Sequence, residues 1–136
     1  MGEASPAPAA APPSLAEASQ WLGFQVDELG GGRAGTIHSL FVDAASGEPV
    51  WLIARLGRRR AKLVAVPLRN CAAAAGRVWT AHRREALRSA PAVDPTRPLL
   101  REHELAICAH YGIGERVGRA AEVVGQSEGS VTSQPA

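Results

Sequence analysis

The chain has 136 residues, which fits one domain, and a formal net charge of +2 from 15 Lys and Arg against 13 Asp and Glu. No window approaches the ~20 apolar residues of a membrane span, the N-terminus has no basic start followed by an apolar run, and Cys71 and Cys108 form no CxxC motif. These features argue against a membrane-spanning or secreted protein, and we expect a cytoplasmic protein with two reduced cysteines.

The charges are distributed unevenly along the chain. Residues 51–88 contain ten bases and one acid, whereas residues 1–50 contain six acids and one base. Such asymmetry indicates either an acidic partner or two oppositely charged parts of one fold that face each other.

Both ends are poor in aromatic and β-branched residues. We therefore expect disorder in the Ala/Pro-rich segment 1–13 and in the tail 114–136, because neither can bury enough apolar surface to offset the entropy of ordering. The predicted domain spans residues 14–113.

The first predicted element is a short helix. Ser14 and Glu17 have the spacing of a capping box, which predicts a helix over residues 15–19. A short strand over residues 21–26 and a glycine-rich turn over residues 28–32 follow.

The next segments predict a β-hairpin. Residues 36–42 form a strand in which the apolar pattern slips between Ile37 and Leu40, which predicts a β-bulge. Residues 45–49 form the loop, where Gly47 can adopt a positive φ. In the strand over residues 50–56, even-numbered residues line one face and odd-numbered residues the other.

Two more strands are predicted, over residues 62–68 and 77–81. A turn over residues 57–60 precedes the first, and a small-residue connection over residues 72–76 joins them. Short strands at this spacing are typical of a sandwich or barrel.

The C-terminal part of the domain is predicted to be helical. Residues 83–89 can form one or two turns, and apolar residues near helical spacing predict a helix over residues 98–111. Gly112 can end that helix in a left-handed conformation.

No motif predicts catalysis, and we expect neither an enzyme nor a cofactor. Residues 30–35 are rich in glycine but lack the Gly-Lys-Ser/Thr ending of a phosphate loop, so we interpret them as a turn. His103 and His110 would be about 10 Å apart along one helix, too far for one metal ion. We therefore expect a buried Cys108 between two surface histidines and no metal site.

The candidate interaction surface consists of basic residues from the middle of the chain. It comprises Arg58, Arg59, Arg60, Lys62, Arg77, Arg83 and Arg84. Such residues can contact phosphates, although a charged turn can equally be only solvated.

Several segments together resemble the PRC-barrel family, the small β-barrel shared by the H subunit of the photosynthetic reaction centre, a ribosome maturation factor and small stand-alone bacterial proteins. The matching segments are Leu22-Gly-Phe-Gln-Val26, Gly35-Thr-Ile with Val42-Asp43, Gly47-Glu-Pro-Val-Trp-Leu-Ile53, Leu63-Val-Ala-Val-Pro67, Leu87-Arg-Ser-Ala-Pro91 and the helix from Leu105 to Gly112. The resemblance implies a mainly β fold, a PRC-type barrel of about five to six short strands with a C-terminal helix, which docks to proteins and has no catalytic site.

Three functional hypotheses follow. The favoured one is a non-enzymatic protein-interaction or adaptor barrel that self-associates, as a homodimer for instance. The second is an RNA- or ribosome-associated module acting through residues 55–88, and the third is a small-molecule or metal binder. Neither the partner nor the process is fixed by the sequence, and no membrane insertion is expected.

Overall fold

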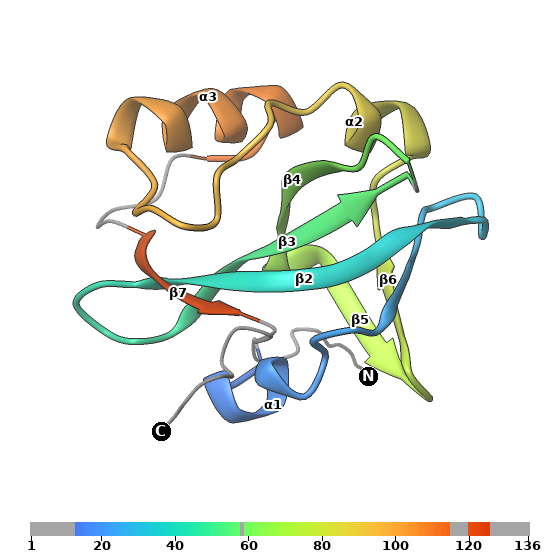
Figure 1. Ribbon diagram of the computed structural model, residues 1–136, viewed down its shortest axis with the longest axis horizontal. Coiled ribbons are helices and arrows are strands. Elements are labelled where there is room, and N and C mark those ends of the chain that lie inside the picture. Colours follow the sequence, from blue (N-terminus) through green and yellow to red (C-terminus); the bar gives the residue numbers. More distant parts are fainter. Residues whose placement is uncertain (1–12, 58, 115–119, 126–136) are drawn as a thin grey trace, which may run out of the picture.

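The protein is described by a computed structural model that covers residues 13–57, 59–114 and 120–125. Its fold is mixed but mainly β (Figure 1). The strands are β1 (Gln25–Asp27), β2 (Arg33–Asp43), β3 (Pro49–Leu56), β4 (Lys62–Pro67), β5 (Cys71–Ala74), β6 (Arg77–Thr80) and β7 (Ala120–Gly125). The helices are α1 (Leu15–Ser19), α2 (Arg84–Arg88) and α3 (Arg101–Tyr111), and a 3-10 turn, η1, spans Leu68–Asn70.

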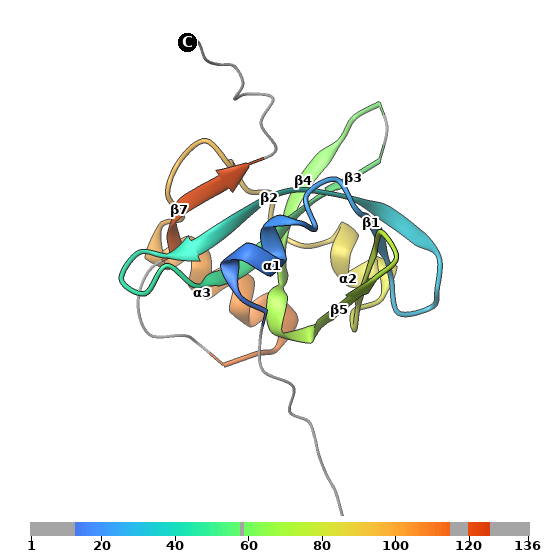
Figure 2. The ribbon, with the colours of Figure 1, turned by 90° about the horizontal axis from the view of Figure 1, so that it is seen from below.

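All seven strands belong to one sheet. The order along it is β4-β3-β2-β1-β6-β5, and β7 pairs with β2. The β1–β6 pair is parallel and the other pairs are antiparallel. One edge of β2 therefore pairs with β1 near its start and with β7 near its end, while β3 occupies the other edge (Figure 2).

The predicted hairpin of β2 and β3 is confirmed, including its bulge. Ile37 pairs with Ala54 and Ser39 with Ile53, so His38 is the extra residue of β2. At the loop, the carboxylate of Asp43 accepts hydrogen bonds from the N–H groups of Ala45 and Ser46 at 3.1 and 2.8 Å. Gly47 has a φ of 74°, which a side chain would disfavour. The acidic residue at the end of β2 is thus part of the turn.

Two hydrophobic clusters lie on opposite faces of β3. Leu52 and Ala54 belong to the first cluster, and the sheet curls around it. Ala18 of α1 and Leu87 of α2 are also members of this cluster. The second cluster contains Trp51 and Ile53 and is covered by α3 (Figure 1). The alternation predicted for residues 50–56 is therefore confirmed from Trp51 to Ala54 but is wrong at Val50, which packs against the second cluster near the register shift between β2 and β3. The middle of β3 is buried on both faces.

Two predicted helices are close to the observed ones. Ser14 caps α1, because its hydroxyl accepts from the N–H of Glu17 at 3.1 Å. The helix predicted over 98–111 begins only at Arg101, and Gly112 ends it with a φ of 68°, as predicted.

The expected barrel is wrong, because the sheet is not closed between β4 and β5. In the described part of the chain these two strands are not paired. The outer edge of β4 is occupied instead by the segment after α2: Val64 forms a bridge with Ala92, and the N–H of Val93 donates to the carbonyl of Leu63 at 2.9 Å. Pro67, which lacks an N–H, ends β4 before η1 turns the chain away.

Three local predictions also need correction. Within the strand predicted over 21–26, only residues from Gln25 onward are in β1, because the N–H of Trp21 continues the turn after α1 by donating to Ala18. The predicted connection over 72–76 contains β5, and the hairpin to β6 turns on Ala75 and Gly76 with φ values of 53° and 78°. Residues 120–125, in the tail predicted to be disordered, form β7.

Among the described residues, no helix is both long and apolar enough to span a membrane.

Candidate functional site

A groove of about 390 Å³ lies in the described surface at one end of the sheet. It is lined by β2, by the end of β3 with the residue that follows, and by α2. Its lining residues are Arg33, Ala34, Gly35, Thr36, Arg55, Leu56, Gly57, Arg84, Leu87 and Arg88. Four of these ten residues are arginines and none is acidic, so we call this feature the arginine groove.

The apolar residues of the arginine groove belong to the fold as well as to the site. Leu56 and Leu87 are part of the first core cluster and are buried. Gly35 is required by strand packing, because a Cβ atom there would lie 2.0 Å from the carbonyl oxygen of Arg55 on β3. The backbone therefore accounts for this glycine without any ligand.

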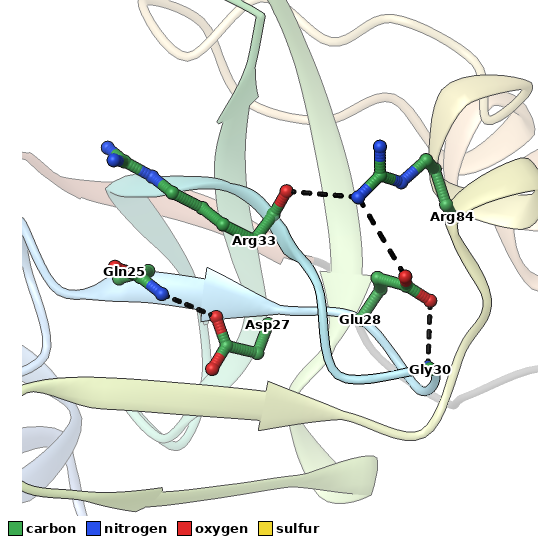
Figure 3. A network of polar contacts seen from close by, with 6 residues as sticks. All are labelled: Gln25, Asp27, Glu28, Gly30, Arg33 and Arg84. Carbon is green, nitrogen blue, oxygen red and sulfur yellow. Dashed lines mark hydrogen bonds and ion pairs between the residues drawn. The ribbon is translucent and has the colours of Figure 1, made fainter.

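Arg84 is held in place from two sides. Its Nη2 donates to the carbonyl oxygen of Arg33 at 3.3 Å and lies 3.8 Å from a carboxylate oxygen of Glu28 (Figure 3). Glu28 is itself fixed by the N–H of Gly30 at 2.8 Å. That hydrogen bond is the main cause that lowers the pKa of Glu28, and the charge of Arg84 acts in the same direction. Arg84 is thus oriented before any ligand arrives.

The other arginines of the groove are less constrained. Within the described residues, the guanidinium groups of Arg55 and Arg88 make no hydrogen bond or ion pair with protein atoms. Both side chains are exposed. Arg33 offers its carbonyl to Arg84, while its guanidinium extends away from that residue (Figure 3). Two cations are therefore available to a ligand without breaking any described contact.

The structure does not gather the predicted basic surface into the groove. Of its seven residues only Arg84 lines the arginine groove. Arg58 lies outside the described residues, and Arg59 and Arg60 are exposed in the turn after Gly57. The remaining three are Arg77, Arg83 and Lys62.

These three residues have different environments. Arg77 pairs with the buried Asp27 on the adjacent strand at 3.4 Å, so its charge is partly used within the sheet. Lys62 donates to the carbonyl of Arg88 at 2.7 Å and thereby fixes the end of α2. Arg83 is the exposed residue before α2.

Sequence reasoning missed Arg33, Arg55 and Arg88 as groove residues. For Arg88 a signal existed, since it lies four residues after Arg84 and one face of a helix must carry both. Arg55 was assigned only to a strand face, and its proximity to α2 follows from the long-range packing of Leu87 against the core.

The opposite end of the sheet presents a different surface. Here β5 is the last strand, with Ala72 and Ala74 exposed, and Trp79 of β6 pairs with Ala72 in the register. The side chain of Trp79 is 40% exposed, which is unusual for a tryptophan in a strand.

The histidines near α3 are part of the packing. His110 was expected on the surface but is partly buried, with its Nε2 2.7 Å from the carbonyl oxygen of Ala86 on α2. His82 stacks on Tyr111 with ring centroids 4.6 Å apart, and burial lowers its pKa, with a smaller effect from His110. Cys108 is buried, as predicted. Among the described residues, no three His, Cys, Asp or Glu side chains cluster in a way that could hold a metal ion.

Burial also controls the other cysteine. Cys71 lies at the start of β5, where its thiol donates to the carbonyl of Pro67 at 3.3 Å. Desolvation raises the pKa of this thiol to about 12, so it is not a reactive thiolate at neutral pH.

The chain matches no family model and no curated protein.

Proposed function

We propose that this chain is a non-enzymatic protein-interaction module of the adaptor type, which self-associates through the open edge of β5. The observation that supports this proposal most directly is that β5 ends the sheet and pairs only with β6 among the described strands. Its residues, Cys71 to Ala74, include no charge and no proline, the features that usually protect an edge strand. Unpaired N–H and C=O groups along such an edge can bind a further strand.

The side chains beside this edge favour a second copy of the chain as the partner strand. Ala72 and Ala74 are small enough to permit close approach, and Trp79 lies next to them on the same face. A two-fold axis through the middle of β5 would pair the strand with itself in antiparallel orientation and place two tryptophans near the contact. A four-residue strand buries little area, so the dimer would be weak and concentration-dependent.

The other end of the sheet is closed to this kind of contact. The outer edge of β4 is occupied by Ala92 and Val93, which hydrogen-bond to it from the segment after α2. Of the two ends of the strand order, β4 is therefore covered and β5 is open.

As part of the same proposal, the sheet is a PRC-type barrel opened between β4 and β5. Support comes from the matching segments around the β2–β3 hairpin, where Asp43 and Gly47 shape the loop. Docking to proteins is what that resemblance implies. The RNA-binding alternative has less support, because Arg77 is paired within the sheet and lies away from the arginine groove.

The test is analytical ultracentrifugation of the full chain over a wide concentration range. Wild-type protein should show a reversible monomer–dimer equilibrium, whereas Ala72→Lys and Ala72→Glu should each remain monomeric, because two like charges would meet near the axis. Mixing the two variants should restore association through opposite charges. Ala106→Lys, a change at an exposed alanine of α3, is the matched control and should dimerise like the wild type.

A monomer at every concentration would refute self-association. A dimer that Ala72→Lys and Ala72→Glu leave intact would refute the β5 edge as the contact.

A further inference from the structure

The arginine groove is a second site, separate from the β5 edge, and we infer that it binds a compact, multiply charged oxyanion: the phosphate or diphosphate end of a small molecule. The inference depends on the convergence of arginines from three elements on one groove of about 390 Å³. It does not require self-association, so either proposal can fail without the other.

The arrangement of charges favours one compact anion. Arg55 comes from β3 and Arg88 from α2, and both line the groove with guanidinium groups that make no hydrogen bond or ion pair with the described residues. Arg84 also lines the groove, and its guanidinium is held by the carboxylate of Glu28 and by the carbonyl of Arg33. A single phosphate has enough oxygens to accept from several guanidinium groups at once, whereas one carboxylate accepts from one or two.

The type of basic residue also favours a phosphate ligand. Every basic residue that lines the groove is an arginine, whose planar fork of donors matches two oxygens of a phosphate. The nearby Lys62 is directed elsewhere, since its ammonium donates to the carbonyl of Arg88.

Glu28 is the acid paired with Arg84, and it does not cancel the charge of the groove. It lies 3.8 Å from Arg84 and is also bound by the N–H of Gly30. Four of the ten lining residues are arginines and none is acidic, so the lining is positive. Glu28 therefore orients Arg84 and leaves Arg55 and Arg88 to meet the ligand.

The size and floor of the groove favour a small molecule over a nucleic acid strand. A volume of about 390 Å³ is in the range of small-molecule sites. The floor contains Ala34, Leu56 and Leu87, which can contact the uncharged body of an organic phosphate. Single-stranded nucleic acid sites usually add aromatic stacking residues, and none of the lining residues is aromatic.

The experiment is a titration of the ¹⁵N-labelled full chain, followed by NMR through the arginine Nε–H and backbone signals. The probes are inorganic phosphate, pyrophosphate and ADP, each without divalent metal, together with a poly-glutamate peptide and a single-stranded RNA. We expect saturable shifts at Arg55, Arg84 and Arg88 with pyrophosphate and ADP. Stronger binding of ADP than of pyrophosphate would identify an organic phosphate as the ligand class, and the reverse would identify the free anion.

Three variants make the result specific. Arg55→Gln and Arg88→Gln should each weaken pyrophosphate binding by about tenfold or more, because a charge-assisted contact is lost. Arg69→Gln, at an exposed arginine of η1 that does not line the groove, should bind like the wild type. Since the guanidinium groups of Arg55 and Arg88 make no hydrogen bond or ion pair with the described residues, both variants should keep the wild-type melting temperature.

The inference is overturned by any of three results. These are no saturable shift with any phosphate probe at millimolar concentration, unchanged pyrophosphate affinity in both groove variants, or binding of the peptide or the RNA at concentrations where pyrophosphate and ADP do not bind.

Discussion

The two halves of the sheet differ in how many of their faces are covered. Strands β2, β3 and β4 are packed on both faces, with the first core cluster on one side and α3 on the other. Strands β1, β6 and β5 bury apolar side chains on one face, where Val26 and Val78 lie, and their other face carries the Arg77–Asp27 pair and the exposed Trp79. The covered half therefore contains most of the buried apolar side chains, and the open half and the arginine groove are the surfaces that we propose for binding.

The largest expected difference between the halves is in side-chain truncation. Ile53 in the covered half is fully buried under α3, so Ile53→Ala should lower the free energy of unfolding by about 2–5 kcal/mol and Ile53→Val by about 0.5–1.5 kcal/mol. Leu29→Ala, near the open half, removes a side chain that is 53% exposed. This substitution should change the free energy of unfolding by less than about 0.5 kcal/mol. Urea denaturation measures all three variants.

If Ile53→Ala cost no more than Leu29→Ala, the second core cluster would not stabilise the fold, and the distinction between the halves would be lost.

A stabilising change should be available in the open half. Ala75, in the β5–β6 turn, has a φ of 53°, which costs a residue with a Cβ atom roughly 1–2 kcal/mol. Ala75→Gly should remove that strain and raise the free energy of unfolding by up to about 1 kcal/mol, since glycine loses more entropy on folding. The matched control is Ala74→Gly, one residue earlier in β5, which should destabilise the protein.

Equal effects of the two glycine substitutions on thermal unfolding would show that the turn is not strained.

The sequence predicted the covered half better than the open half, for a physical reason. In β3 the alternation of Trp51 to Ala54 specifies two buried faces, and Ser14 and Gly112 mark helix ends by local chemistry. β5 could not be predicted from Cys-Ala-Ala-Ala, because alanine has low strand propensity and only pairing with β6 makes it a strand. The open gap between β4 and β5 depends on Ala92 reaching Val64, a contact between segments far apart in the chain.

The candidate site was harder to predict than the fold. A run of bases such as Arg58 to Arg60 is visible in the sequence, yet the groove is built from separate residues that no local pattern connects. Arg55 and Arg88 come together because Leu87 packs α2 against the end of β3. Charge composition therefore indicated either an acidic partner or two oppositely charged parts of one fold, and it did not locate a site.

A smaller effect should link pH to the packing between the halves. His82 follows β6, stacks on Tyr111 of α3, and has a lowered pKa because of burial and the nearby His110. Its unfolded-state pKa is about 6.5, so below that pH the unfolded chain binds the proton more readily and the free energy of unfolding should fall as the pH is lowered. His82→Gln should flatten this slope in urea titrations between pH 7 and pH 5, values that bracket the ordinary histidine pKa. His103→Gln, at a half-buried histidine of α3, is the control and should keep the wild-type dependence of stability on pH.

The smallest expected change in stability is paired with a large change in association. Trp79 is 40% exposed and belongs to neither core cluster, so Trp79→Ser should alter the free energy of unfolding by only about 0.5 kcal/mol. If the β5 edge is the dimer contact, the same variant should shift the sedimentation equilibrium toward monomer, because an aromatic anchor beside Ala72 is lost. A variant that loses several kcal/mol of stability would instead make Trp79 a packing residue and extend the covered half into β6. Stability unchanged and association lost would show that this half of the sheet exists for contact, since a side chain that neither folds the protein nor binds a partner would have no reason to leave so much apolar surface in water.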